Sequence, residues 1–135
     1  MDNAVIIVRV GQQRHLPQRV MVIAIVTALQ ESDLCNLASR AVPESFRYPH
    51  QGDSVDNDSV GLFQQRPSQG WGSVATLMDP VRSAGLFYSA LVRVPGWESM
   101  SLAAAAQAVQ RSAFPSAYSK HEYRAAQIVA AILTS

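Results

Sequence analysis

The sequence has a single cysteine, Cys35, among its 135 residues. One thiol cannot form an internal disulfide and has no partner for a metal cluster, so we expect a structural cysteine. The histidines His15, His50 and His121 lack the spacing of metal ligands, and we expect them in loops or on the surface. The sequence therefore indicates no metal and no other cofactor.

Charge and long apolar runs are also scarce. Charged residues make up 16% of the chain and its net charge is +1, so no basic excess points to nucleic acid. The longest apolar run, Val20 to Ala28, falls far short of the roughly 20 residues of a membrane span. Neither a basic segment nor a cleavage site follows Met1-Asp2-Asn3, which argues against a secretory signal. We expect a domain cut from a longer chain.

Apolar residues are plentiful, at 48%, which predicts one domain over residues 1–135 with a single core. Helical spacing of these residues, with capping residues and Pro/Gly stops, predicts an all-α fold of five or six helices. The expected helices cover residues 4–10, 17–31, 80–94, 102–112 and 117–133, with Gly11 ending the first. Residues 32–58 are expected to form an irregular loop, and 60–72 short turns or a small β-hairpin.

The helix over 17–31 should be central, because it is apolar all round. It ends on Glu31, whose carboxyl group would then lie at the edge of the core. Burial disfavours the charged form of a carboxyl group, and this property suits a general acid. Glu31 is therefore the candidate catalytic residue, and Ser32 is expected to orient the turn that follows it.

Four motifs follow one another in an order that resembles a known family. They are Glu31-Ser32, Gly61-Leu62-Phe63-Gln64, Ala104-Ala105-Ala106-Gln107-Ala108, and Tyr118 at the start of the last predicted helix. The set resembles soluble lytic transglycosylases of the lysozyme-like superfamily, which cleave the glycan of peptidoglycan. The stretches 58–72 and 106–118 are most similar to transglycosylase-like domains of actinobacteria and their phages. The resemblance covers about residues 4–130.

The resemblance implies a lysozyme-like fold, with a cleft between the central helix and the Gly61 turn. It implies that Glu31 protonates the glycosidic oxygen between N-acetylmuramic acid and N-acetylglucosamine, and then accepts the proton of the C6 hydroxyl. That hydroxyl closes a 1,6-anhydro ring, so an attached nucleophile replaces a bound water. The implied partner is peptidoglycan, met by a monomer outside the cell, in the cell wall or on a virion.

The resemblance places Gln64 near the scissile bond and the Tyr118 hydroxyl beside Glu31. An amide donates and accepts at once, which suits sugar hydroxyls and N-acetyl groups. Each side chain also has an ordinary structural reading, Gln64 as a loop amide and Tyr118 as a packed aromatic. The remaining candidates for substrate binding are Gln65, Phe63, Ser59 and Gln107. Phe63 and Trp71 could stack on a sugar or belong to the core.

Two features depart from the family pattern. Gln107 stands where the family has Asn and Val109 where it has Gly, which puts a sugar contact at Gln107 in doubt. The spacing from Glu31 to Gly61 is longer than usual, and the extra loop at about 40–57 could reshape one end of the cleft.

The residues also leave other functions open. A carboxylate opposite Glu31, with Asp58 as the best candidate, could hold a water and give a hydrolytic muramidase like goose-type lysozyme. Turn chemistry alone explains Asp in such a loop, and a calcium site from Asp53, Asp56 and Asp58 lacks the full ligand pattern. Two readings without catalysis remain. One is a glycan-binding or structural module of a phage tail or secretion assembly. The other is a helical interaction domain, which a fully exposed Glu31 would favour.

Overall fold

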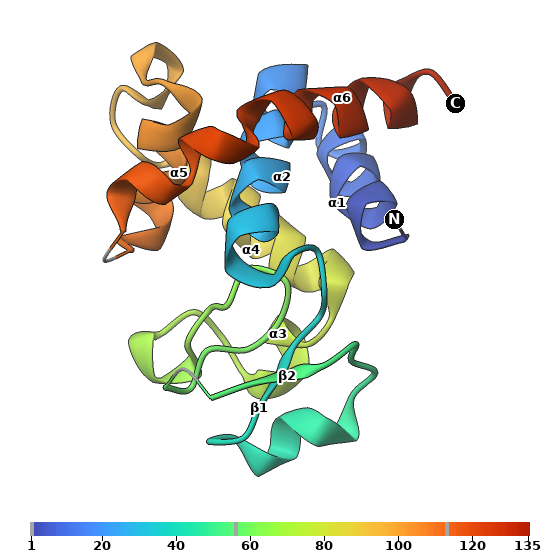
Figure 1. The fold of residues 1–135 in the computed structure, drawn as a ribbon, viewed down its shortest axis with the longest axis vertical. Coiled ribbons are helices and arrows are strands. Elements are labelled where there is room, and N and C mark those ends of the chain that lie inside the picture. Colours follow the sequence, from blue (N-terminus) through green and yellow to red (C-terminus); the bar gives the residue numbers. More distant parts are fainter. Residues whose placement is uncertain (1, 56, 113) are drawn as a thin grey trace.

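The computed structural model describes residues 2–55, 57–112 and 114–135, and their fold is mostly helical (Figure 1). Helices α1, α2, α4, α5 and α6 gather in one lobe, and a second lobe of loops holds α3 and a two-stranded sheet. The helices are α1 (Asp2–Gln13), α2 (Gln18–Ser32), α3 (Val74–Leu77), α4 (Pro80–Val92), α5 (Leu102–Gln110) and α6 (Glu122–Leu133). The all-α prediction is confirmed.

Helix α2 lies at the centre of the helical lobe, as its sequence predicts. Every residue from Val20 to Leu29 is buried, and α1, α4, α5 and α6 all contact this helix. Pro17 precedes its first turn, where the missing N–H breaks no helical hydrogen bond. Asp33 ends it in the left-handed region with φ 53°, and its N–H bonds to Ala28 and Leu29 carbonyls. The chain therefore turns sharply immediately after Glu31 and Ser32.

Helix α1 does not end at Gly11, contrary to the sequence prediction. The helix continues to Gln13, and Gly11 is buried inside it. A Cβ on Gly11 would lie 2.9 Å from Cγ of Met21 and 3.0 Å from the hydroxyl oxygen of Tyr88. Glycine is therefore needed here because α2 and α4 approach closely, and not because the helix stops.

Local capping signals predict the starts of α4 and α5 correctly. The Asp79 carboxylate accepts from the N–H groups of Val81 and Arg82, and the Ser101 hydroxyl accepts from Ala104 N–H. Both helices end two residues earlier than expected. Arg111 closes α5 in the left-handed region with φ 51°, where its N–H bonds to the Gln107 carbonyl.

The expected last helix over 117–133 is broken at its start. Short 3₁₀ turns span Pro115–Ala117 and Ser119–His121, and α6 begins only at Glu122. Tyr118 lies between the two turns and is fully buried. The break turns this side chain into the molecule, whereas α6 crosses over α2 (Figure 1).

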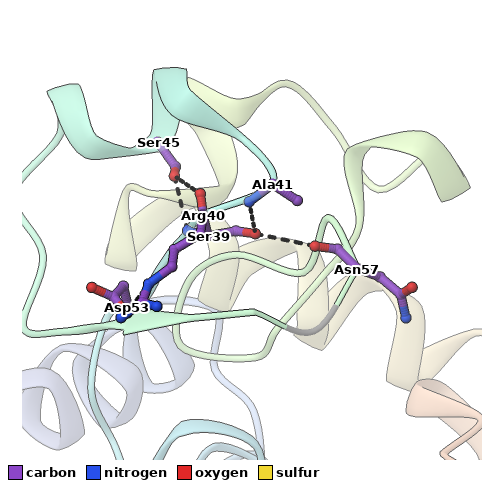
Figure 2. Close-up of polar contacts among 6 residues, drawn as sticks. All are labelled: Ser39, Arg40, Ala41, Ser45, Asp53 and Asn57. Carbon is purple, nitrogen blue, oxygen red and sulfur yellow. Dashed lines mark hydrogen bonds and ion pairs between the residues drawn. The ribbon is translucent and has the colours of Figure 1, made fainter.

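The irregular lobe holds most of the long segment between Glu31 and Gly61. Strands β1 (Ala38–Ser39) and β2 (Asp53–Ser54) pair in parallel, which the sequence did not predict. Figure 2 shows how side chains fasten this segment: Ser39 N–H donates to Ser45 Oγ at 2.9 Å, and Ser39 Oγ donates to the Asn57 carbonyl at 3.1 Å. Arg40 pairs with Asp53 at 3.1 Å. The loop is thus held by its own polar groups.

A tight turn follows this loop, at the place where the sequence predicts turns or a small hairpin. Val60 and Gln65 form an antiparallel bridge, with backbone hydrogen bonds of 3.0 and 3.1 Å. The short helix α3, capped by Ser73, was not predicted, because four residues carry too little periodicity. None of the helices described here has the length and apolar character that crossing a membrane requires.

Candidate active site

Glu31 lies in the last turn of α2, half-buried at the end of an otherwise buried helix. Its Oε2 accepts a hydrogen bond of 2.6 Å from the Tyr118 hydroxyl, across 87 residues of sequence. The expectation that this hydroxyl lies beside the carboxyl group is confirmed. No described residue donates to Oε1, so this oxygen has no hydrogen bond to the described part of the chain.

Tyr118 supplies a donor that stays protonated. Burial, followed by the hydrogen bond and charge of Glu31, raises the pKa of Tyr118 well above its ordinary value. The hydroxyl therefore remains a hydrogen-bond donor over the whole range in which a carboxyl group titrates. It fixes the position of the Glu31 carboxyl group without competing for its proton.

Ser32 ties the end of α2 to the Gly61 turn. Its hydroxyl lies 2.7 Å from the Leu62 carbonyl oxygen and 3.1 Å from that of Ala28. Gly61 has φ 86°, and a Cβ there would collide with the Leu77 carbonyl oxygen, so only glycine fits. The motif Gly61–Gln64 therefore lies directly against the residue that follows Glu31. The Ser32 hydroxyl was expected to orient the turn after Glu31, and it bonds to the Gly61 turn instead.

Gln64 is half-buried and sits in the left-handed region with φ 51°. Its Nε2 donates to the Gly61 carbonyl at 3.1 Å, which closes the turn on itself. The side chain also lines a pocket of about 640 Å³. Gln64 thus has both a structural contact and access to a pocket.

This pocket lies between the Gly61 turn and two helix ends. Its walls come from residues 64–66, 69 and 71, from residues 90 and 93–95 at the end of α4, and from residues 108–111 at the end of α5. The expected cleft lay between α2 and the turn, but α2 contributes no described residue to this pocket. The reason is that Ser32 is bonded to Leu62, so α2 and the turn are packed together.

Phe63 is not a substrate-binding residue, which corrects one sequence prediction. Its side chain is fully buried and stacks on Phe87, with ring centroids 4.8 Å apart. The carbonyl of Phe63 accepts a hydrogen bond of 2.8 Å from Gln110, so α5 is also fastened to the turn. Trp71, in contrast, is half-buried and lines the pocket.

Three further candidates lie in different surroundings. Gln65 is 2% exposed and lines the pocket. Ser59 is half-buried and lies before the Gly61 turn. Gln107 donates to the Ser112 carbonyl at 2.9 Å, so its amide nitrogen holds the end of α5, and it does not line the pocket.

Asp58 is held in an ion pair beside the turn. Its Oδ1 lies 2.5 Å from Nε of Arg66, and its Oδ2 accepts from Ser68 N–H at 2.8 Å. Burial alone would raise the pKa of Asp58, but these hydrogen bonds outweigh it and lower the pKa to about 2. Both oxygens are therefore engaged in holding residues 66–68. Asp53 pairs with Arg40, and Asp56 lies outside the described residues.

Gln30 and His121 form a contact that the sequence did not suggest. Nε2 of His121 lies 2.9 Å from Oε1 of Gln30. Gln30 immediately precedes Glu31 in the chain. Burial, and then the charges of Lys120 and Arg124, lower the pKa of His121, so its ring is neutral near neutral pH. His121 lies in the 3₁₀ turn after Tyr118, in keeping with the expected loop position, and this turn brings its ring to α2.

Within the described residues no three His, Cys, Asp or Glu side chains are grouped to hold a metal ion. No protein-family model matches the chain, and no curated protein matches it. The geometry of Glu31, Tyr118 and the Gly61 turn is therefore the basis for assigning a function.

Proposed function

We propose that this chain is a lytic transglycosylase with a lysozyme-like fold that cleaves peptidoglycan glycan strands. The observation that carries the proposal is the contact between Tyr118 and Glu31, at 2.6 Å, at the tip of a buried helix. A half-buried carboxyl group with one oxygen held by a tyrosine and the other free suits a general acid. The Gly61–Gln64 turn, bonded to Ser32, brings amide groups to the same region.

The reaction needs one carboxyl group in two roles. Protonated Glu31 gives its proton to the glycosidic oxygen as the bond from C1 of the muramoyl sugar to that oxygen breaks. Ionised Glu31 then takes the proton of the C6 hydroxyl while that oxygen bonds to C1. The products are a 1,6-anhydromuramoyl end and a free hydroxyl on the leaving sugar, and Glu31 is protonated again.

The site supports this reaction better than hydrolysis. A hydrolase needs a second carboxylate to hold water or attack the sugar. Asp58, the best candidate for that role, already pairs with Arg66 and Ser68 through both oxygens. An intramolecular hydroxyl requires no such residue, because it is already attached at high effective concentration. Hydrolytic muramidase action through Glu31 and Asp58 is the alternative outcome of the test.

The test is mass spectrometry of the soluble products from purified peptidoglycan. We expect anhydro products, one water lighter than reducing muropeptides. Glu31→Gln should lower the rate by roughly a thousandfold or more, since an amide cannot transfer the proton. It should fold normally, because its side-chain oxygen can still accept from Tyr118.

Glu98→Gln is the matched control, since Glu98 is an exposed carboxylate in the Trp97–Ser99 turn. The activity of this variant should equal that of the parent protein. Reducing products would point to the muramidase instead. Binding to cell walls without any soluble product would support a non-catalytic glycan-binding module. An active Glu31→Gln variant would remove the acid from the mechanism.

A further inference from the structure

The pocket beside the Gly61 turn carries an unusual set of side chains. Three arginines line it, Arg66, Arg93 and Arg111, and none of the described lining residues is acidic. Arg66 is already paired with Asp58, whereas Arg93 and Arg111 are exposed and pair with no described carboxylate. The pocket lining thus includes two arginines that have no carboxylate partner among the described residues.

Buried amides in the same pocket also lack partners. Neither Nε2 nor Oε1 of Gln65 has a hydrogen bond to a described residue, although the side chain is 2% exposed. Gln110 uses its Nε2 for the Phe63 carbonyl, but its buried Oε1 is unpaired among the described residues. Leaving buried polar groups unpaired destabilises the folded protein. Both glutamines line the pocket, which makes them candidates for pairing with a ligand.

These groups together define the chemistry of the ligand. Arginine binds carboxylates through paired N–H donors, and a glutamine amide pairs with another amide by donating and accepting at once. Trp71 adds a half-buried ring against which an aliphatic side chain can pack. A group with backbone amides next to a carboxylate satisfies every one of these side chains. The volume of about 640 Å³ is sufficient for a short peptide.

We propose that this pocket binds the carboxylate-bearing peptide stem of the glycan substrate, with Arg93 and Arg111 on the carboxylate and Gln65 on a stem amide. This inference rests on the proposed function, because it names the part of peptidoglycan that the pocket recognises. A short path of residues connects the pocket with Glu31. Gln64 lines the pocket, and the Leu62 carbonyl in the same turn bonds to the hydroxyl of Ser32, which follows Glu31 in the chain. A stem bound there makes the enzyme select strands that still carry peptides.

The first test measures binding alone, so that it does not depend on cleavage. The probe is an N-acetylated stem tripeptide with free carboxylates, titrated into the protein by NMR, beside the same peptide with every carboxyl group amidated. The free peptide should bind, and amidation should weaken it about tenfold or more. Arg93→Gln/Arg111→Asn should weaken it to the same extent; asparagine is chosen because residue 111 has φ 51°.

The matched control is Arg9→Gln/Arg47→Gln, which removes two charges outside the pocket and should bind like the parent protein. Gln65→Met separates a ligand contact from a core role. If Gln65 only fills space, methionine should keep or raise the melting temperature and leave peptide binding unchanged. The proposal expects unchanged or higher stability together with weaker binding.

The second test compares digestion of intact peptidoglycan with that of glycan strands freed of their stems by an amidase. The parent protein should have the lower KM on intact strands, and Arg93→Gln/Arg111→Asn should lose that preference. Equal binding of free and amidated peptides, or an arginine variant that binds like its control, would overturn the inference. Peptide binding by a chain that cleaves no glycan would uphold the pocket and reject the proposed function.

Discussion

At the scale of single residues, the site depends on which oxygens of each carboxyl group already accept hydrogen bonds from the chain. Glu31 has one oxygen held by Tyr118, whereas Asp58 has both oxygens bonded, to Arg66 and Ser68. A carboxylate bonded to the chain through both oxygens is held in place, whereas one with an oxygen free of such bonds can approach a substrate. This difference supports the proposal that Glu31 is the acid and that Asp58 holds the loop.

The first residue-scale prediction concerns Tyr118→Phe. The buried ring remains, but the hydrogen bond that positions Glu31 is lost. We expect kcat for peptidoglycan cleavage to fall about 10- to 100-fold with little change in KM, because a hydrogen bond to a charged group contributes about 1.5–3 kcal/mol. Steady-state kinetics with soluble glycan strands checks this. A loss of activity that is fully explained by a lower melting temperature would show that the hydroxyl acts only on stability.

The second concerns Asp58→Asn and pH. Because the pKa of Asp58 is about 2 in the folded protein and 3.8 ordinarily, its charge stabilises the fold above about pH 4. That contribution is lost as the pH falls through about 2. We expect the variant to be less stable by about 1–2 kcal/mol near neutral pH.

The difference from the parent protein should shrink toward zero as the pH approaches 2. Urea unfolding along a pH series measures it. A constant difference down to that pH would mean that the charge of Asp58 contributes nothing and that the amide disturbs the loop in another way.

At the scale of elements, close packing decides where helices run. Helix α1 continues through Gly11. At this residue α2 and α4 approach the backbone so closely that a Cβ atom would clash with them. The Tyr88 hydroxyl on α4 donates to the Ile7 carbonyl at 2.7 Å, which holds α1 and α4 together. Small side chains and one buried hydroxyl thus set the spacing of the helices that surround α2.

We therefore predict that Gly11→Ala destabilises the protein, although alanine is the better helix former. The methyl group would lie 2.9 Å from Cγ of Met21, and overpacking of this kind costs about 1–3 kcal/mol. The gain in helix propensity recovers at most about 1 kcal/mol. Chemical denaturation measures the net loss, with exposed Gln13→Ala in the same helix as the control. A stabilised Gly11→Ala variant would show that Met21 moves aside freely.

At the scale of the whole molecule, the two lobes are joined through the Gly61 turn. Ser32 bonds to Leu62, Gln110 bonds to Phe63, and the Phe63 ring stacks on Phe87. Leu62 and Phe63 thereby belong to the core of the helical lobe although they come from the loop segment. The turn that carries Gln64 is part of the same packed unit as α2.

We predict that the lobes unfold together. Trp71 packs against the cores of both lobes, whereas Trp97 packs against the helical core alone. Fluorescence of Trp71→Phe and Trp97→Phe should each give one transition, and each should coincide with the loss of helical circular dichroism in the same variant. Were the Trp71 signal to change well before the helical one, the loop lobe would be an independent unit.

The sequence by itself determined the central helix, the position of Glu31 at its end, and the starts of α4 and α5, because periodicity and capping act within a few residues. It also carried the order of motifs that placed Tyr118 beside Glu31. Only the tertiary structure decided that Gly11 lies inside a helix, that Phe63 is buried, and that His121 meets Gln30. These contacts join residues far apart in the chain, and local patterns contain no information about which distant surfaces will meet. For the same reason the pocket of arginines and amides became visible only once α4, α5 and the turn were in place.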